Sequence, residues 1–461
     1  MSKVCLINPP LNMHLRLWYP IGIGYVARAL HDAGHDVEVI DCIGENLSKQ
    51  QFLERIRSLV HIDVFGVGGL IMAFNHVCWI TKTLRTRFPN SLIVAGNTVG
   101  STVPELLLEH SAVDGIVMWE GERTMVNVVN TMSVDVPGMY GQSARPPLPQ
   151  FNKRPFWEAL PMQNYYNNNG GVHPLSMVRG CPYRCTFCLH LFMGYKPRCR
   201  SADSLLQELV EAYNQFHIRE FVLLDDLSIM FQHTMKEFCR KKQQHPQLQK
   251  LRWRCSGRVN LLDDAMVSMM ADAGCYAIGL GFESANQEVL DYYHKNQTVD
   301  QMIQAIQICN TYNVDVATNG SFMIGCPIES EQSIRESSLF AQKYGLRFVP
   351  HIVTPFPGTS LYQYAEDHQL ITNQYQYVQR LAKQGHTNTV VVNLTSMTDD
   401  VLMGLKQKYM VVPKKTIHTY IQKLPVLWHT VKHQGVGSAV TKIHQFTKPV
   451  ACTHQWWNEW Q

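Results

Sequence analysis

Three cysteines lie close together in the segment Arg179–His190, which reads RGCPYRCTFCLH. Cys181, Cys185 and Cys188 have the spacing C-x(3)-C-x(2)-C, which could bind zinc, close a disulfide or hold an iron–sulfur cluster. Structural zinc sites usually have four protein ligands, often as two C-x-x-C pairs, and no second pair follows in this sequence. The nearest further cysteine is Cys199, eleven residues after Cys188. The spacing therefore disfavours zinc.

The composition argues against a disulfide. The chain has 461 residues, 45% of them hydrophobic, and its 13 cysteines are an odd number spread mostly singly through apolar stretches. Met1, Ser2 and Lys3 lead directly into a strand-like segment, so we expect no signal peptide. No uncharged apolar stretch reaches the ~18 residues that a membrane span needs. We therefore expect a cytoplasmic protein without a transmembrane segment, in which cysteines stay reduced.

An iron–sulfur cluster is the remaining possibility. A cubane 4Fe–4S cluster held by only three thiolates has one iron without a protein ligand. That iron is open to an external molecule, which is a chemical reason for having three cysteines rather than four. The net charge of +4 at pH 7 is close to balance, so we expect no nucleic-acid partner.

The region after the cysteines is a series of strand–helix units, which predicts a parallel sheet. In (β/α) barrels, which are built from such units, catalytic groups gather at the carboxyl ends of the strands. The side chains of interest in or just after these strand-like segments are Asp225, Asp226, Arg258, Glu283, Cys326 and His351. A lone cysteine or histidine is more often structural than catalytic. Cys326 and His351 are therefore candidates only, and the catalytic residues stay unassigned.

Residues 1–135 alternate between strand-like and helical segments. The strand-like segments are Val4–Asn8, Asp36–Asp41, Asp63–Gly68, Ser91–Gly96 and Gly115–Trp119. The helical patterns between them are Gly22–Ala33, Gln50–Val60, Asn75–Phe88 and Val103–His110. This alternation predicts a five-stranded doubly wound parallel sheet, which binds ligands at the carboxyl ends of its strands. Glycines at these ends, such as Gly68, Gly69 and Gly96, let a bulky ligand approach the backbone, although they are also ordinary turn residues.

Composition changes divide the chain into four parts. Residues 136–172 are rich in Pro, Gly and Asn, so we expect a linker between the sheet of residues 1–135 and a partial barrel over residues 173–400. Residues 401–461 form a small helical C-terminal region, which we expect to cap the barrel; contact with a membrane surface or a partner is the alternative. Its basic end is rich in His and Trp, with helix-compatible stretches at Thr416–Lys423 and Leu427–Lys432.

The cysteine array directly after a strand resembles the signature of the radical SAM superfamily. This resemblance implies a 4Fe–4S cluster held by Cys181, Cys185 and Cys188. Its open iron would chelate the amino and carboxylate groups of S-adenosylmethionine (SAM) and pass an electron to the sulfonium. Phe187 matches the aromatic position that packs near the adenine of SAM. The resemblance also implies the fold, a partial (β/α)6 barrel.

Segments further along are similar to those of one branch of this superfamily. The stretch GLGFESANQEVLDYYHK matches a Gly-x-Glu-Ser segment, which implies that Glu283 lies near the ribose or amino group of SAM. Arg258 is implied to pair with the SAM carboxylate, and Asp225 and Asp226 with its amino group. FMIGCPIESEQS matches a segment whose backbone lines the adenine, and PFPGTSLY matches a family turn. The alternative for these four charged residues is a buried salt-bridge network inside the barrel.

Residues 1–135 resemble the cobalamin-binding domain that precedes many radical SAM domains, through INPP, YPIGIGYVARALHDAGHDVEVID, VAGNTVG and DGIVMWEGE. The resemblance implies cobalamin at the strand ends that carry Gly68, Gly69, Leu70, Gly96, Asn97 and Glu120. The Asp-x-His-x-x-Gly loop of well-studied cobalamin domains is missing, and His14 has the wrong spacing. We therefore expect no histidine of this loop on cobalt, and an apolar lower face at residues 70–72. The alternative is a degenerate domain that has lost cobalamin.

Together these resemblances imply a cobalamin-dependent radical SAM enzyme of the methyltransferase type. Such an enzyme uses two SAM molecules, one to methylate cobalamin and one to generate a 5′-deoxyadenosyl radical that takes a hydrogen from an unactivated carbon. We expect a small-molecule or peptide substrate, and an electron donor such as flavodoxin or ferredoxin. One alternative is a cyclase, rearrangement or dehydration enzyme in which cobalamin is absent or does not methylate. Another is a non-catalytic scaffold, which the intact cysteine array disfavours.

Overall fold

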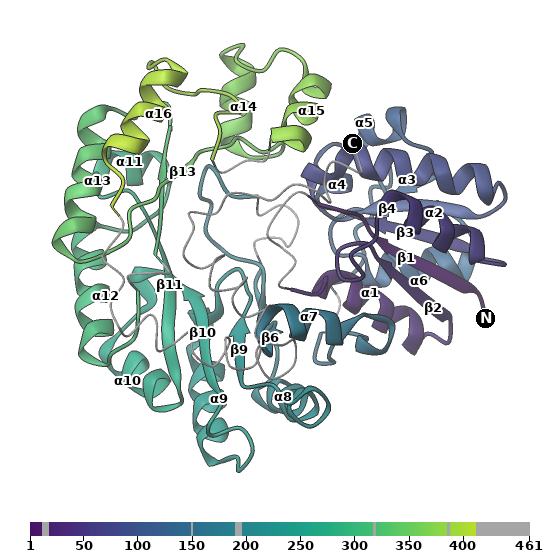
Figure 1. Cartoon of the computed structure of the whole chain (residues 1–461), viewed down its shortest axis with the longest axis horizontal. Coiled ribbons are helices and arrows are strands. Elements are labelled where there is room, and N and C mark those ends of the chain that lie inside the picture. The colour runs from purple at the N-terminus through teal and green to yellow at the C-terminus, as the bar shows by residue number, and fades with distance from the viewer. Residues whose placement is uncertain (12–17, 149–150, 190–195, 317–319, 385–387, 412–461) are drawn as a thin grey trace. The chain divides into compact units, whose positions relative to one another are not determined.

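A computed structural model describes residues 1–11, 18–148, 151–189, 196–316, 320–384 and 388–411 of the chain (Figure 1). The chain divides after Val172 into two compact units, each with its own parallel sheet and flanking helices. His14 and the stretches Thr416–Lys423 and Leu427–Lys432 lie outside the described residues. No helix in the described part of the chain is long and apolar enough to cross a membrane.

The first unit is built on a five-stranded sheet in the order β2-β1-β3-β4-β5, in which every neighbouring pair is parallel. The strands are β1 (Lys3–Asn8), β2 (Asp36–Asp41), β3 (Val64–Gly68), β4 (Leu92–Gly96) and β5 (Gly115–Ile116). Val4, Cys5 and Ile7 of β1 are fully buried, as expected for a sheet covered on both faces. The predicted doubly wound parallel sheet is therefore confirmed. Its strand order reverses between β1 and β3, where such sheets bind ligands.

The helices of this unit are α1 (Ile21–Asp32), α2 (Lys49–Ser58), the 3-10 helix η2 (Ile71–Ala73), α3 (Phe74–Arg87), α4 (Asn97–Thr102), α5 (Pro104–His110) and α6 (Glu122–Thr131). Helix α2 begins with a capping box: Ser48 Oγ accepts the Gln51 N–H at 3.2 Å, and Gln51 Oε1 accepts the Ser48 N–H at 2.8 Å. The sequence did not predict α4. It begins directly after β4 because Asn97 adopts a left-handed φ of 67°, which asparagine tolerates.

Residues 136–172, expected to form a linker, belong to the first unit. They contain the 3-10 helix η3 (Trp157–Ala159) and helix α7 (Met162–Asn169). Tyr165 of α7 donates its hydroxyl to Asp41 Oδ2 at 2.6 Å, and Asn164 Nδ2 donates to the Gly44 carbonyl at 3.1 Å. A Cβ atom at Gly44 would lie 2.5 Å from the Tyr165 ring, so this position needs glycine. These contacts fix α7 at the carboxyl end of β2.

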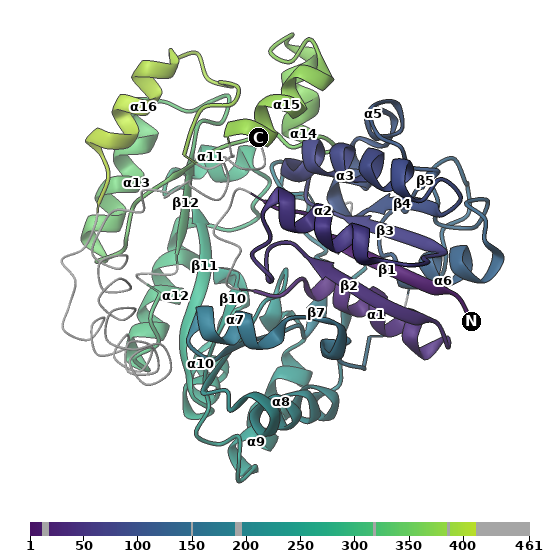
Figure 2. The same ribbon diagram turned by 45° about the vertical axis from the view of Figure 1, so that its right-hand side comes forward.

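The second unit contains a six-stranded sheet in the order β13-β12-β11-β10-β9-β6. The strands are β6 (Val172–Leu175), β9 (Glu220–Leu223), β10 (Arg252–Gly257), β11 (Cys275–Glu283), β12 (Ser321–Ile324) and β13 (His351–Ile352). The pairs from β9 to β13 are parallel. Figure 2 shows the sheet curved, with helices along its outer side. The predicted partial (β/α)6 barrel is confirmed.

Those helices are α8 (Ala202–Phe216), α9 (Gln232–Gln244), α10 (Asp264–Asp272), α11 (Gln287–Tyr292), α12 (Val299–Thr311) and α13 (Glu331–Lys343). An aromatic cluster forms part of the core between the sheet and α9. Trp253 stacks on Phe221 with ring centroids 5.7 Å apart, and both rings meet Phe238 edge-on. C-terminal helices follow the barrel strands: α14 (Ser360–Asp367), α15 (Gln374–Gln384) and α16 (Asp399–Lys408). Helices α14 and α15 lie before residue 401, within the range that we expected to belong to the barrel.

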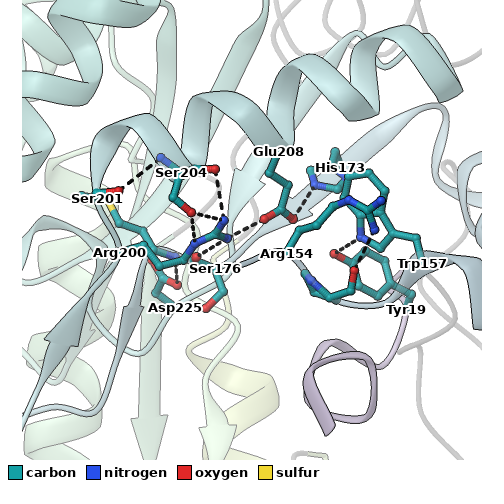
Figure 3. Close-up of polar contacts among 12 residues, drawn as sticks. Tyr19, Arg154, Trp157, His173, Ser176, Arg200, Ser201, Ser204, Glu208 and Asp225 are labelled. Carbon is teal, nitrogen blue, oxygen red and sulfur yellow. Dashed lines mark hydrogen bonds and ion pairs between the residues drawn. The ribbon is translucent and has the colours of Figure 1, made fainter. Parts of the chain in front are cut away.

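A buried network of charged side chains holds α8 close to β6 (Figure 3). Glu208 of α8 bonds to Arg200 and also lies 3.2 Å from His173 Nε2, measured from Oε1. Arg200 Nη1 donates to the Ser176 carbonyl at 3.2 Å, and Arg200 Nη2 to Ser204 Oγ at 2.8 Å. Burial alone would raise the pKa of Glu208, but Arg200 and His173 lower it below its usual value. The network thus fixes the chain just before the cysteine loop.

Candidate functional site

The three cysteines of the array lie in a loop after β7 (Val178–Arg179), which pairs with the antiparallel β8 (Arg198–Cys199). Cys181 and Cys185 are buried and Cys188 is half-buried; none forms a disulfide. The loop is tied down through Thr186. Its N–H donates to the Tyr293 carbonyl at 3.0 Å, and its carbonyl accepts the Leu361 N–H at 3.1 Å. The loop is therefore held by segments that follow β11 and β13.

The three thiols of this loop are the kind of donor set that holds a 4Fe–4S cluster, in which each thiolate binds a different iron. Burial raises the pKa of Cys181 and raises that of Cys188 to about 12, so these thiols must lose protons when they bind metal. No three His, Cys, Asp or Glu side chains among the described residues are grouped so that they could hold one metal ion.

Asp225 and Asp226 follow β9 and support the strand that leads into the cysteine loop. Asp225 Oδ1 accepts the Met177 N–H at 2.8 Å, and Asp226 Oδ2 accepts the Gly180 N–H at 2.9 Å. Asp225 Oδ2 is shielded from solvent and has no hydrogen-bond partner among the described residues. Burial raises the pKa of Asp225 to about 7. One carboxylate oxygen at this strand end is thus left without a hydrogen bond among the described residues.

Glu283 ends β11 and is buried in an ion pair. Lys295 Nζ donates to Glu283 Oε1 at 2.7 Å, and Ser321 Oγ donates to Oε2 at 3.4 Å. Glu283 has a left-handed φ of 61°, a conformation that costs energy for a residue other than glycine. A Cβ atom at Gly281 would lie 2.4 Å from Glu283 Oε1, so glycine makes room for the carboxylate. Of the two roles considered for Glu283, the salt bridge is present here.

Arg258, just after β10, is directed at the cysteine loop. Its Nη1 lies 3.6 Å from Cys185 Sγ, and its Nη2 donates to the Lys295 carbonyl. Its Nε donates to Asn260 Oδ1 at 3.3 Å, and the guanidinium lies 3.7 Å from the centre of the Tyr183 ring. Arg258 thus contacts two residues of the loop that holds the cysteines.

Phe187 lies beside the same group of residues. Its ring meets Tyr293 edge-on, with centroids 5.1 Å apart, and Lys295 Nζ lies 5.8 Å from its centre. The structure therefore brings Phe187, Arg258 and Glu283 together around Lys295.

The two candidate catalytic residues lie in different surroundings. Cys326, after β12, is fully buried, and burial raises the pKa of its thiol to about 12. His351 begins β13 and is exposed.

Lys295 is the residue of this site that the sequence did not reveal. It lies in the segment between α11 and α12, where His294 and Asn296 both have a φ of 50°. It is buried and contacts Glu283, Phe187 and Arg258 as described above. In the sequence Lys295 is a lone lysine in YYHKNQ, twelve residues after Glu283, and no motif marks it.

The expected cobalamin residues lie at strand ends of the first unit. A Cβ atom at Gly69 would approach the side chains of Ala73, Pro9 and Val77 to within 3.2 Å, so close packing against these side chains accounts for this glycine. One at Gly96 would meet Val117 at 3.3 Å, whereas one at Gly68 would make only ordinary contact with Ile23.

The loops after β3 and β4 are joined to each other. The Val99 N–H donates to the Gly69 carbonyl, and the Ile71 N–H to Thr98 Oγ1, both at 3.1 Å. Leu70 is half-buried, and Ile71 and Met72 are buried, so the loop after β3 presents an apolar segment. Asn97 starts α4, and Glu120 is buried in the connection between β5 and α6.

Comparison with known proteins agrees with both units. The family model of the Radical SAM superfamily matches residues 175–341, and that of the B12 binding domain matches residues 15–129. The chain therefore belongs to the cobalamin-dependent radical SAM enzymes. Enzymes of this class use a 4Fe–4S cluster and SAM in the barrel and cobalamin in the B12 binding domain.

The similar proteins include methyltransferases and a cyclase. The chain is 27% identical over 393 residues to an uncharacterized methyltransferase, PH0819, of Pyrococcus horikoshii, covering 80% of this chain and 84% of that protein. It is 25% identical over 374 residues to the anaerobic magnesium-protoporphyrin IX monomethyl ester cyclase of Cereibacter sphaeroides. This match covers 76% of this chain and 61% of that protein.

Two solved structures share the fold. The radical SAM methyltransferase TsrM of Kitasatospora setae has a TM-score of 0.69 at 18% identity, covering 80% of this chain and 77% of that chain. The cobalamin-dependent S-adenosylmethionine radical enzyme OxsB has a TM-score of 0.69 at 17% identity, and the match covers 97% of this chain and 75% of that chain.

Proposed function

We propose that this enzyme methylates an unactivated carbon of a small-molecule or peptide substrate. The observation that carries the proposal is the combination, in one chain, of the three-cysteine loop with a domain that matches the B12 binding family. When bound, the cluster and SAM supply a 5′-deoxyadenosyl radical, and cobalamin supplies the methyl group. Relatives named as methyltransferases support this choice.

The charges at the strand ends suggest how this chain holds SAM. Asp225 has an oxygen without a partner among the described residues, and an ammonium group beside it would favour its ionised form. We assign Asp225 to the amino group of SAM, with Asp226 holding the Gly180 backbone in place. Lys295 already neutralises Glu283. The remaining acceptor capacity of Glu283 therefore suits the ribose hydroxyls better than a second cation. Phe187 is proposed to pack near the adenine.

In the first unit, the proposed cobalamin contacts are Gly68, Gly69, Leu70, Gly96, Asn97 and Glu120. Leu70 and its buried neighbours Ile71 and Met72 make an apolar segment after β3. Such a segment offers no nitrogen or oxygen side chain to cobalt. We therefore propose that the lower face of cobalamin is covered by apolar side chains.

The test is to reconstitute the full chain anaerobically with iron, sulfide and cobalamin, and to measure two products of SAM. A reduced flavodoxin or ferredoxin, the proposed electron donor, would be supplied. Formation of 5′-deoxyadenosine reports radical cleavage, and formation of S-adenosylhomocysteine reports methyl transfer from SAM. Absence of 5′-deoxyadenosine from protein that carries the cluster would refute the radical SAM assignment.

A second candidate function is an oxidative cyclisation. It is supported by the match to the anaerobic cyclase over 76% of this chain. A cyclase would cleave SAM to 5′-deoxyadenosine without forming S-adenosylhomocysteine. The same two products therefore separate the candidates.

A further inference from the structure

We propose that Arg258 is a positioning residue for the iron–sulfur cluster. Through its contact with the sulfur of Cys185, Arg258 raises the reduction potential of the cluster. The inference rests on the proposed function, because it requires a cluster on Cys181, Cys185 and Cys188. The step concerned is the one-electron reduction of the cluster, with the electron supplied by the flavodoxin or ferredoxin proposed above.

The guanidinium of Arg258 is fixed in place by several contacts. It lies against the Tyr183 ring at 3.7 Å, Nη2 donates to the Lys295 carbonyl, and Nε donates to Asn260 Oδ1 at 3.3 Å. The remaining terminal nitrogen, Nη1, lies 3.6 Å from Cys185 Sγ. Arg258 is buried, so little freedom remains for its side chain. The contact with sulfur is thus enforced by the other three.

Of Lys295, Asp226 and Arg258, Arg258 is the charged residue that is neither paired nor exposed to solvent. Lys295 is neutralised by Glu283, which lies 2.7 Å from its ammonium group. Asp226 is exposed to solvent, which screens its charge. Among the described residues, Arg258 forms no ion pair with a carboxylate, so its positive charge acts on the thiolates beside it. Both its charge and its N–H group are directed at one cluster ligand.

A fixed cation beside a thiolate ligand favours the reduced cluster. Reduction adds a negative charge, and potentials of such clusters depend on net charge and on hydrogen bonds to the sulfurs. This effect is large where solvent is excluded. The sequence had implied that Arg258 binds the SAM carboxylate. The contacts of Arg258 support a role at the cysteine loop instead.

The experiment measures the midpoint potential of the cluster in the reconstituted full chain without SAM, by a redox titration followed by electron paramagnetic resonance. In Arg258→Gln the equilibrium constant for reduction is expected to fall at least tenfold, which corresponds to 59 mV for one electron. Arg258→Lys keeps the charge but loses the forked donor, so its potential should fall by less. Arg254→Gln removes the same charge from the same strand, β10, and should leave the potential unchanged.

SAM affinity, measured on the same variants, separates the two roles of Arg258. An unchanged potential in Arg258→Gln together with weakened SAM binding would overturn the proposal in favour of the SAM carboxylate. If Arg258→Gln does not retain a cluster, Arg258→Lys decides, and a wild-type potential in that variant overturns the proposal. Failure of the wild-type chain to assemble a cluster would instead refute the proposed function itself.

Discussion

Lys295 and Glu283 are twelve residues apart in the sequence, yet Lys295 Nζ lies 2.7 Å from Glu283 Oε1. The six-residue helix α11 and the left-handed turn at His294 return the chain to the carboxyl end of β11. A buried carboxylate needs such a partner, because an isolated charge would be costly to bury. A ligand placed beside Glu283 would therefore meet a hydrogen-bond acceptor whose charge Lys295 already neutralises.

This relationship predicts two separable effects of Glu283→Gln. SAM affinity should fall by up to two orders of magnitude, because one hydrogen bond is worth about 0.5–3 kcal/mol. Stability should also fall, because Lys295 is left buried without its partner. The double variant Glu283→Gln/Lys295→Met should recover stability but not SAM affinity. Thermal unfolding and equilibrium binding of SAM measure the two effects.

The outcome that contradicts this assignment is an unchanged SAM affinity in a well-folded Glu283 variant. In that case Glu283 acts only in the salt bridge. In either case the three-cysteine cluster should still assemble, which iron analysis checks.

The cysteine array predicts about four irons per chain after anaerobic reconstitution. Replacement of Cys181, Cys185 or Cys188 by Ala should abolish SAM cleavage, because each thiolate binds a separate iron. Cys199→Ala is the matched control and should cleave SAM normally. Formation of 5′-deoxyadenosine is the measurement, and its persistence in any of the three variants would remove that cysteine from the cluster.

The apolar segment after β3 predicts that cobalamin binds in the base-off form without a histidine on cobalt. Electron paramagnetic resonance of the cob(II)alamin state should show no superhyperfine splitting from an axial nitrogen. Observation of that splitting would refute the proposed lower face. Failure to bind cobalamin at all would favour the alternative of a degenerate domain that serves as a scaffold.

Lys242 of α9 predicts an unusual dependence of stability on pH. Its side chain is fully buried, its ammonium donates to the Ala273 carbonyl at 2.8 Å, and burial lowers its pKa from 10.5 to about 8. The folded state therefore releases its proton at lower pH than the unfolded state. Between pH 8 and pH 10.5 the free energy of unfolding of the wild type should therefore rise, relative to that of a variant without the Lys242 ammonium group.

Lys242→Met tests this dependence. The variant should be more stable than the wild type at pH 7 by an amount on the order of 3 kcal/mol, since the pKa falls from 10.5 to about 8 and one pKa unit corresponds to about 1.4 kcal/mol. The difference should narrow as the pH approaches 10. Lys241→Met is the control: Lys241 pairs with Asp203 and Glu237 near the surface, so its loss should give no gain. Urea unfolding at both pH values measures the difference, and a less stable Lys242→Met variant would contradict the prediction.

Local patterns in the sequence were sufficient to predict the sheets. The strands of both units are short apolar runs bounded by turns, and the parallel arrangement follows from their alternation with helices. The cysteine spacing is also local, so the cluster ligands could be proposed without a structure. Helix α7 was missed because Met162–Asn169 is rich in asparagine and lacks a clear periodicity. It is stabilised by Tyr165 and Asn164, whose partners lie more than a hundred residues earlier.

The direction of the polar side chains at the strand ends could not be predicted in the same way. The sequence placed Arg258 and Glu283 at the correct edge of the barrel. It gave no information on which neighbour each would contact, because Cys185 and Lys295 lie on other segments of the chain. Such pairings depend on tertiary packing rather than on local periodicity.

The bond between Tyr165 and Asp41 determines where this protein can be divided. A fragment that stops at residue 135, where the composition changes, would lack α7 and leave the buried carboxylate of Asp41 without its Tyr165 donor. A fragment that extends to Val172 keeps this contact and all the described residues of the first unit. Genetic dissection or exchange of the two units should therefore use the junction at Val172, because a cut at residue 135 removes part of the fold that it is meant to isolate.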